Sequence, residues 1–313
     1  MDGGKVVIAS LAFALCSTAA CAEGGVKVHS AVVPPDAQAK QRGAVRTVDV
    51  AAFPSTYHRE FVAGPASGLQ SSYLAVTRIP PGKSDSGLHT EPSDKIYFVL
   101  KGQLSVQLGS DTFATDADSM VVVPAGVRHR VWNAGGAEEI HVEVMAPASA
   151  SGAMTSSAQP RKIENAAALI RRPTPEGYVH PRPGGPGGAY AQKMADQGFG
   201  AQWLQARDFH GDFYFAMSEV HSKPGASSPP WHFHPFDQIY FVTDGAMTVE
   251  LGTKTYQVKP YSFVIIPAGT VHRNWNSGTV LEKHLNFIVP EPAKGEAWDI
   301  GVELKGDITK QDK

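Results

Sequence analysis

Short runs of β-branched and aromatic residues recur along the chain, and turn-forming residues separate them. Three such runs in the first half are IYFVL at 96–100, QLSVQL at 103–108 and SMVVVP at 119–124. Gly, Asp and Pro interrupt the runs at intervals typical of a β-sandwich or barrel, and no long helical period lies between them. The pattern therefore predicts an all-β protein made of short antiparallel strands.

The same runs return 143 positions later in the chain. QIYFV at 238–242, AMTVEL at 246–251 and SFVIIP at 262–267 repeat the first set, and WHFHPF at 231–236 aligns with LHTEPS at 88–93. The alignment from Pro81 to His141 needs no insertion to match Pro224 to His284. An ungapped register of this length indicates a duplication, so we predict two tandem antiparallel barrels.

The remaining segments suggest how the chain is organised around the two repeats. We predict a signal peptide at 1–22, an N-terminal arm at 23–45, a first domain at 46–148, a linker at 149–200, a second domain at 201–300 and a tail at 301–313. The linker contains PRPGGPGG at 181–188, which could be a simple linker or a lid, and 161–172 could form one short helix.

The first 22 residues predict export. An apolar run after Lys5 ends in small residues, and cleavage after Ala22 fits the usual signal-peptide pattern. The protein would then be periplasmic or secreted, or a lipoprotein anchored through Cys21. Both cysteines of the chain, Cys16 and Cys21, lie in this segment, so the mature protein would contain no disulfide.

Composition narrows the classes of partner. The 313 residues are 42% hydrophobic and 19% charged, which suits folded domains with a proper core. A formal net charge of −2 provides no basic field for nucleic acid. No segment beyond the signal peptide is apolar enough to span a membrane. We therefore expect a small-molecule substrate, and a homo-oligomer is possible.

The second repeat carries a candidate metal site. His232 and His234 are two residues apart, which places both imidazoles on one face of a strand. Gln238 follows, and His272 comes after a Pro-Ala-Gly turn. Antiparallel pairing could bring His272 opposite the first two histidines. Three converging imidazoles form a site for a divalent transition metal such as Fe, Mn, Ni, Cu or Zn, although buried core histidines are the simpler alternative.

These residues resemble the two sequence motifs of the cupins. Gly225, His232-x-His234, Gln238 and Gly245 are similar to the first motif, and Pro267-x-Gly269, His272 and Asn276 are similar to the second. The resemblance covers both repeats and suggests a bicupin, which implies a double-stranded β-helix barrel for each copy and metal ligation by the histidines. Among bicupins, it resembles the quercetin dioxygenase-like proteins. In this family a glutamate normally occupies the position of Gln238.

The glutamine alters the chemistry that the resemblance implies. Its amide oxygen can bind a metal, but it brings no charge and cannot act as a base. A catalytic base must then lie elsewhere, or the substrate must arrive ionised. Tyr240 shares the strand face of Gln238 and is a candidate for proton transfer or substrate positioning. His284 is a further catalytic candidate if its strand face lines the cavity, but solvent is the simpler interpretation of that face.

The first repeat has changed at the ligand positions, which become His89, Glu91, Lys95 and His129. Without the lysine, two histidines and a carboxylate would suit non-haem iron. An ammonium beside a divalent cation is strongly repulsive, however. We therefore favour a degenerate, metal-free site in which Lys95 pairs with Glu91, and we expect one metal per chain. Asp94 and Asp237, which match across the repeats, are expected at turns or at the surface.

Three functions remain open from the sequence. The first is a metal-dependent dioxygenase that acts on a small enolic or phenolic compound in the second barrel. The second is a metal-dependent lyase or isomerase that acts next to a carboxylate. The third is a non-catalytic bicupin that binds a small molecule. The residues name neither the metal nor the substrate.

Overall fold

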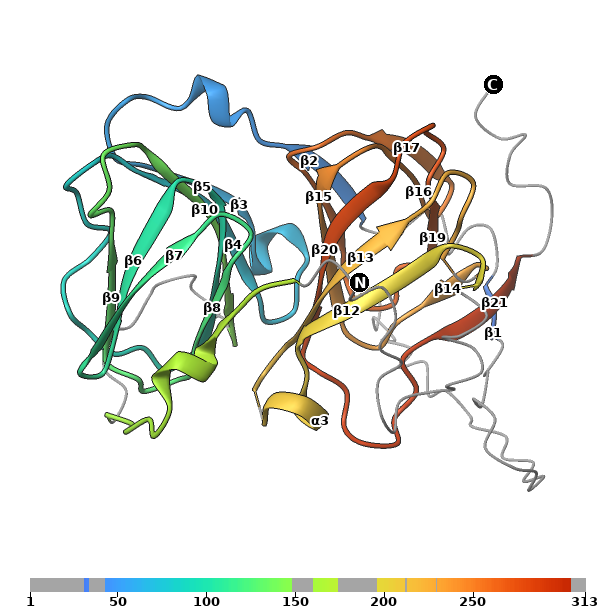
Figure 1. Cartoon of the computed structure of the whole chain (residues 1–313). Helices are drawn as coiled ribbons and strands as arrows, with labels where there is room; N and C mark the ends of the chain where they lie inside the picture. The colour runs from blue at the N-terminus through green and yellow to red at the C-terminus, as the bar shows by residue number, and fades with distance from the viewer. Residues whose placement is uncertain are drawn as a thin grey trace, which may run out of the picture.

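A computed structural model describes residues 31–33, 43–147, 160–173, 196–211, 213–228 and 230–304. It contains two antiparallel β-barrels side by side (Figure 1), so the all-β prediction with two tandem barrels is confirmed. The strands of the first barrel are β3 (His58–Ala63), β4 (Tyr73–Ile79), β5 (Asp94–Lys101), β6 (Gln103–Leu108), β7 (Asp111–Asp116), β8 (Met120–Val123), β9 (His129–Trp132) and β10 (Glu139–Ala146).

The second barrel repeats this order and adds strands at its edges. Its strands are β12 (Phe199–Gln205), β13 (Ala216–Ser222), β14 (His232–Phe233), β15 (Asp237–Asp244), β16 (Met247–Leu251), β17 (Lys254–Val258), β18 (Ser262–Ile266), β19 (His272–Trp275), β20 (Glu282–Val289) and β21 (Ile300–Leu304). A parallel strand, β1 (Ala31–Val33), pairs with β21. Each barrel consists of two facing sheets, with β5 and β10, or β15 and β20, paired in the middle of one.

Alternation along β15 explains how the barrels are positioned relative to each other. Tyr240 and Val242 lie in a hydrophobic cluster inside the second barrel. Ile239 and Phe241 point the other way and belong to a larger cluster that also contains Phe98 of the first barrel. Both faces of the strand are therefore buried. Each fully buried aliphatic or aromatic side chain contributes about 1.5–3 kcal/mol, so this shared cluster holds the two barrels together.

Two short strands complete the barrel sheets from outside the repeats. β2 (Ala44–Thr47) lies before the first barrel in sequence, but it pairs with β18 of the second barrel (Figure 1). β11 (Ile170–Arg171) lies in the linker and pairs with β8 of the first barrel. Residues 46 and 47, which the sequence assigns to the first domain, thus extend a sheet of the second. Backbone pairing of these two strands, in addition to the shared hydrophobic cluster, therefore connects the segments around the two barrels.

Two matching aspartates cross the boundary between the barrels. Asp94 accepts hydrogen bonds from Ala125 N and, across the boundary, from Tyr214 N, each at 2.7 Å. Asp237 likewise accepts from Ala268 N at 3.1 Å and from Gln70 N of the first barrel. Both aspartates are buried, so the expectation of a surface position is wrong, although each does support a Pro-Ala-Gly turn. Each aspartate therefore connects a turn of its own barrel to a backbone amide of the other barrel.

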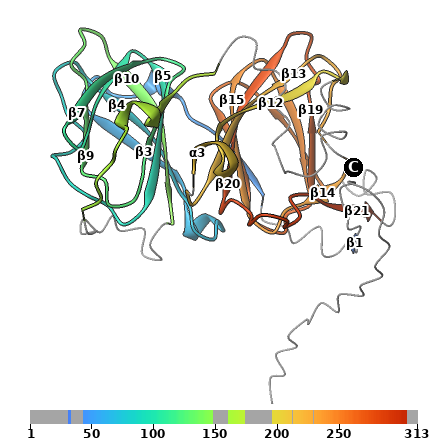
Figure 2. The same cartoon turned by 60° about the horizontal axis from the view of Figure 1, so that its bottom comes forward.

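The linker contains less helix than the sequence predicts. The possible helix at 161–172 is reduced to a four-residue 3-10 turn, η3 (Ala166–Leu169), followed at once by β11. Figure 2 shows this segment running along the first barrel. The predicted signal peptide, most of the arm and the segment 181–188 lie outside the described residues. Among the described residues, no helix is long and apolar enough to cross a membrane.

Candidate metal centre

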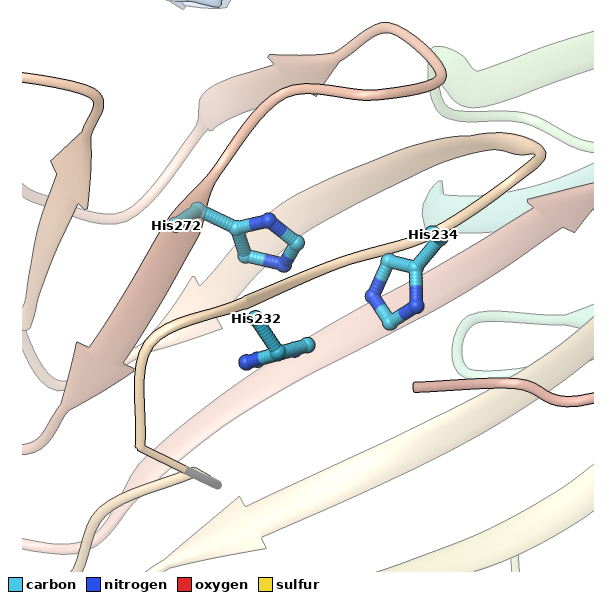
Figure 3. A group of neighbouring side chains, drawn as sticks. All are labelled: His232, His234 and His272. Carbon is cyan, nitrogen blue, oxygen red and sulfur yellow. The ribbon is translucent and has the colours of Figure 1, made fainter. Parts of the chain in front are cut away.

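Three histidines of the second barrel point toward one another (Figure 3). His232 lies on β14 directly opposite His272 on β19, and His234 follows two residues after His232. The ring centroids of His232 and His272 are 4.4 Å apart, and His234 lies 4.9 Å from each. One ring nitrogen of each histidine lies within 4.8 Å of the others. The distant third histidine is thus brought to the pair by antiparallel pairing.

Backbone carbonyls hold the orientation of all three rings. The Nδ1 atoms of His232, His234 and His272 lie 2.8 Å from Pro230 O, 2.6 Å from Trp298 O and 2.9 Å from Thr270 O. A carbonyl can only accept, so each Nδ1 carries the proton and donates it. The Nε2 atom of each ring is then left with a lone pair. This arrangement is typical of metal-binding histidines, in which the second nitrogen is fixed by a hydrogen bond.

Burial keeps two of these imidazoles neutral. Burial, together with the neighbouring His232, lowers the pKa of His234 to about 4. Burial also lowers the pKa of His272 well below its usual value, again with help from the other two rings. Neutral imidazole is the form that binds a metal. His234 and His272 are therefore in their ligating form at neutral pH.

Gln238 on β15 completes the ring of donors. Its Oε1 lies 3.0 Å from His272 Nε2 and accepts a hydrogen bond from the hydroxyl of Tyr240 at 3.0 Å. Its Nε2 donates to Asn286 Oδ1 at 3.1 Å. In this orientation the oxygen of Gln238 faces the lone pair of a neutral His272. Two acceptors this close repel each other unless a cation lies between them, so the amide oxygen is placed as a fourth ligand.

A buried pair of a histidine and a glutamate also lies in the second barrel. His284 Nδ1 lies 2.8 Å from Glu282 Oε1, both residues are almost fully buried, and the His284 ring lies 4.8 Å from Tyr240. In the first barrel, Glu139 and His141 form an equally buried pair. The interpretation that this strand face looks toward solvent is wrong. His284 thus packs against Tyr240 and pairs with Glu282.

The first barrel has a matching pair of opposed histidines, which we call the frame of the site, but the residues around it carry different charges. His89 and His129 face each other with ring centroids 4.5 Å apart, and Glu91 lies with them. Lys95 Nζ lies 2.6 Å from Glu91 Oε2. The expected pairing of Lys95 with Glu91 is present. Burial alone would raise the pKa of Glu91, but the hydrogen bond from His89 and the charge of Lys95 hold it at about 2.

Lys95 has a second carboxylate that the sequence analysis did not connect to it. Glu143 Oε1 lies 3.0 Å from Lys95 Nζ, and the other oxygen of Glu143 pairs with Arg59. Burial alone would lower the pKa of Lys95, but Glu143 and Glu91 together raise it. The amine is therefore an ammonium ion and not a nucleophile. In the sequence, Glu143 alternates with apolar residues along its strand. That alternation does not tell whether Glu143 faces the cavity or the solvent, so the contact with Lys95 was not predictable from it.

A segment near the C-terminus also contributes to the second site. Trp298 supplies the carbonyl that holds His234, and its ring lies 5.9 Å from Phe236, which stacks on His234 at 4.7 Å. Asp299 Oδ1 lies 3.3 Å from His234 Nδ1. No sequence motif marks these residues, because they act on His234 from more than sixty positions away through the fold.

Sequence comparisons match both repeats to a known domain family. A family profile described as a cupin domain matches residues 75–144 and 218–287. A polyketide synthase, CurC from Streptomyces cyaneus, is 29% identical over 94 residues, which cover 29% of this chain and 61% of that relative's length.

Solved structures show the same two-barrel fold at low sequence identity. A putative glyoxylate-induced protein from Pseudomonas aeruginosa gives a TM-score of 0.60 at 14% identity over 90% of this chain and 99% of its own. A salicylate 1,2-dioxygenase variant from Pseudoaminobacter salicylatoxidans gives 0.59 at 12% identity, covering 80% and 84%. AerE from Microcystis aeruginosa gives 0.56 at 13% identity, covering 80% and 99%. At these identities the likeness shows the fold alone.

Proposed function

Since this chain belongs to the cupin family and carries two of its domains, we propose that its second barrel is a mononuclear metal-dependent dioxygenase site. The substrate would be a small enolic or phenolic compound. The observation that carries the proposal is the cluster of His232, His234 and His272. All three side chains are buried, and each donates Nδ1–H to a backbone carbonyl.

The residues present fit a divalent transition metal. Three neutral imidazoles and the Gln238 oxygen would hold it, and none of the four donors is a carboxylate. A metal bound there supplies Lewis acidity and positions for substrate and dioxygen to bind next to each other. Because its ligands are neutral, the site favours an anionic oxygen, such as an enolate, phenolate or carboxylate.

Tyr240 would position Gln238 rather than accept a proton. Its hydroxyl donates to Gln238 Oε1, and burial raises the pKa of the phenol far above neutrality. A buried neutral phenol is a hydrogen-bond donor at neutral pH and not a base. His284 is in turn committed to Glu282. The substrate is therefore proposed to arrive ionised, or to lose its proton to water, which is consistent with an enol or phenol.

The structural neighbours give this proposal a first set of compounds. A related fold is that of a salicylate 1,2-dioxygenase solved with gentisate, an acidic phenolic molecule. We propose dihydroxybenzoates as test compounds beside flavonols and β-diketones. These classes share adjacent or conjugated oxygens that can bind one metal side by side.

The test combines metal analysis with oxygen uptake. Purified protein should contain about one transition-metal equivalent per chain, and oxygen consumption should follow addition of one of the test compounds. His272→Ala should abolish both, whereas His129→Ala at the matching position of the first barrel should leave both in place. Metal binding without oxygen uptake by any compound would reject the dioxygenase proposal. Turnover without oxygen would instead indicate the lyase or isomerase.

One observation favours a second candidate, the non-catalytic binding module. Among the described residues, the carboxylate nearest to the three histidines is Asp299, and it faces the Nδ1 side of His234 rather than the Nε2 side. Within the described part of the chain, no carboxylate therefore lies on the Nε2 side, where a metal and substrate would bind. Calorimetric binding of a test compound to the metal-loaded protein, with no product by mass spectrometry, would establish this function.

Export is proposed on the sequence alone. The mature chain is expected to begin after Ala22, in the periplasm or outside the cell, or at a lipidated Cys21. Intact-mass measurement of the protein from its own host separates these outcomes. A chain that retains residues 1–22 would reject both.

A further inference from the structure

The first barrel contains the frame of a metal site around a buried lysine. His89 and His129 bridge each other through their backbones, just as His232 pairs with His272 in the second barrel. Their Nδ1 atoms lie 2.7 Å from Gly87 O and 2.9 Å from Val127 O. The hydrogen bonds to Nδ1 that orient the rings in the second barrel are thus present in the first as well.

The donor atoms of this frame converge on one place. One atom each from His89, Glu91 and His129 lies within 4.8 Å of the others. His129 Nε2 is buried and makes no hydrogen bond to any described residue. Two imidazoles and one carboxylate are a donor set that suits divalent transition metals, non-haem iron among them.

The ammonium of Lys95 takes the electrostatic place of a cation in this frame. Its side chain is 1% exposed, and its Nζ lies between two carboxylates, 2.6 Å from Glu91 and 3.0 Å from Glu143. A divalent cation bound to Glu91 would lie close to this buried positive charge, and the repulsion would be severe at low dielectric. Lys95 and Arg59 lie among three carboxylates, Glu91, Glu143 and Asp85. The Lys95 ammonium is in direct contact with Glu91, so it is the charge that would oppose a metal there.

We propose that the first barrel is a latent metal site that Lys95 holds closed, and that removing this one ammonium opens it. With a neutral side chain at position 95, Glu91 would lose its ammonium partner, whereas Glu143 would keep Arg59. The buried Glu91 carboxylate would then lie beside two oriented imidazoles without the positive charge that now opposes a metal. A divalent transition metal would then bind through His89, Glu91 and His129. The inference does not depend on the proposed dioxygenase, because it concerns the other barrel.

The experiment measures metal content in the full chain with the second site removed. In a His272→Ala background, Lys95→Gln should raise bound Co²⁺ from near zero to about one equivalent, with the visible absorption of a ligated ion. Adding His129→Ala should abolish the gain. Lys101→Gln is the matched control, because Lys101 lies on the same strand with an exposed side chain and should add no Co²⁺.

Two results would overturn the proposal. One is a full equivalent of Co²⁺ in the His272→Ala protein with Lys95 intact, provided that His129→Ala removes it. The other is a folded Lys95→Gln protein that binds none. If the Lys95→Gln protein does not fold, Lys95→Met provides a second variant without charge. Should both variants be unfolded, refolding by Co²⁺ supports a latent site, and failure to refold with Co²⁺ rejects it.

Discussion

The two barrels have the same pair of opposed histidines but place different charges around it. The ring centroids of the opposed histidines are 4.5 Å apart in the first barrel and 4.4 Å apart in the second. Around that frame, three positions differ together, namely Glu91 for His234, Lys95 for Gln238 and Glu143 for Asn286. The first barrel contains its own cation with two carboxylates. The second contains only neutral donors, and these leave room for an external cation.

The difference shows that the three exchanges depend on one another. A lysine introduced alone would be a buried charge without a counter-ion, and two carboxylates alone would repel each other. Lys95 lies between Glu91 and Glu143, and Arg59 lies between Glu143 and Asp85, so the first barrel supplies cations of its own to its buried carboxylates. Such a site needs no metal to offset its carboxylates, whereas the second barrel gains most when a metal joins its donors.

The largest expected effect follows from removing one histidine from each barrel. His272→Ala should lower metal content from about one equivalent to less than about a tenth, because two imidazoles and an amide hold a metal weakly. His129→Ala should leave the metal content unchanged. Elemental analysis of both purified proteins makes this comparison. Equal losses in the two variants would show that the barrels are not different in the way described.

Breaking the ion network of the first barrel should cost stability. Glu143→Gln leaves Lys95 and Arg59 short of one negative charge, with an expected loss of about 3–5 kcal/mol in the free energy of unfolding. Asp116→Asn is the control, since Asp116 pairs with Arg172 at the surface and its removal should cost far less. Urea denaturation measures both. A loss below 1 kcal/mol for Glu143→Gln would argue against a tightly coupled network.

Acid should weaken the first barrel through His129. Burial is the main cause that lowers its pKa to about 4 in the folded protein, so the unfolded state, with an ordinary histidine pKa near 6.5, binds the proton more tightly. The contribution of neutral His129 is present above pH 6.5 and is lost as the pH falls toward 4. The full loss is on the order of 3 kcal/mol. His129→Gln should flatten this part of the stability curve, and an unchanged slope between pH 6.5 and 4 would contradict it.

The smallest expected effect comes from the matched tyrosines. Tyr240→Phe removes the hydroxyl that donates to Gln238, which should cost about 1 kcal/mol and weaken metal binding roughly tenfold. Tyr97→Phe should be neutral or slightly stabilising, since the Tyr97 hydroxyl is buried without a hydrogen bond to any described residue. Thermal unfolding and metal titration of both variants test this. Equal effects would show that Tyr240 has no role in positioning Gln238.

Much of the fold and most of the donor residues were predictable because they depend on local periodicity. Alternation along a strand puts Gln238 and Tyr240 on one face in any barrel, and the repeat assigns Lys95 to the place of Gln238. The faces of the last strands were not predictable in the same way. His284 and Glu143 alternate with apolar residues, as surface residues also do, and only the closed barrel shows that both are buried.

The sequence by itself determined the duplication, the antiparallel strands and the approximate composition of both sites, since these follow from patterns within a strand or a motif. Only the tertiary structure decided which groups meet from distant parts of the chain. Glu143 reaches Lys95, Trp298 holds His234, and β2 joins the opposite barrel because barrel closure and docking set those distances. Burial then converts these contacts into shifted pKa values and fixed tautomers, which no local pattern encodes.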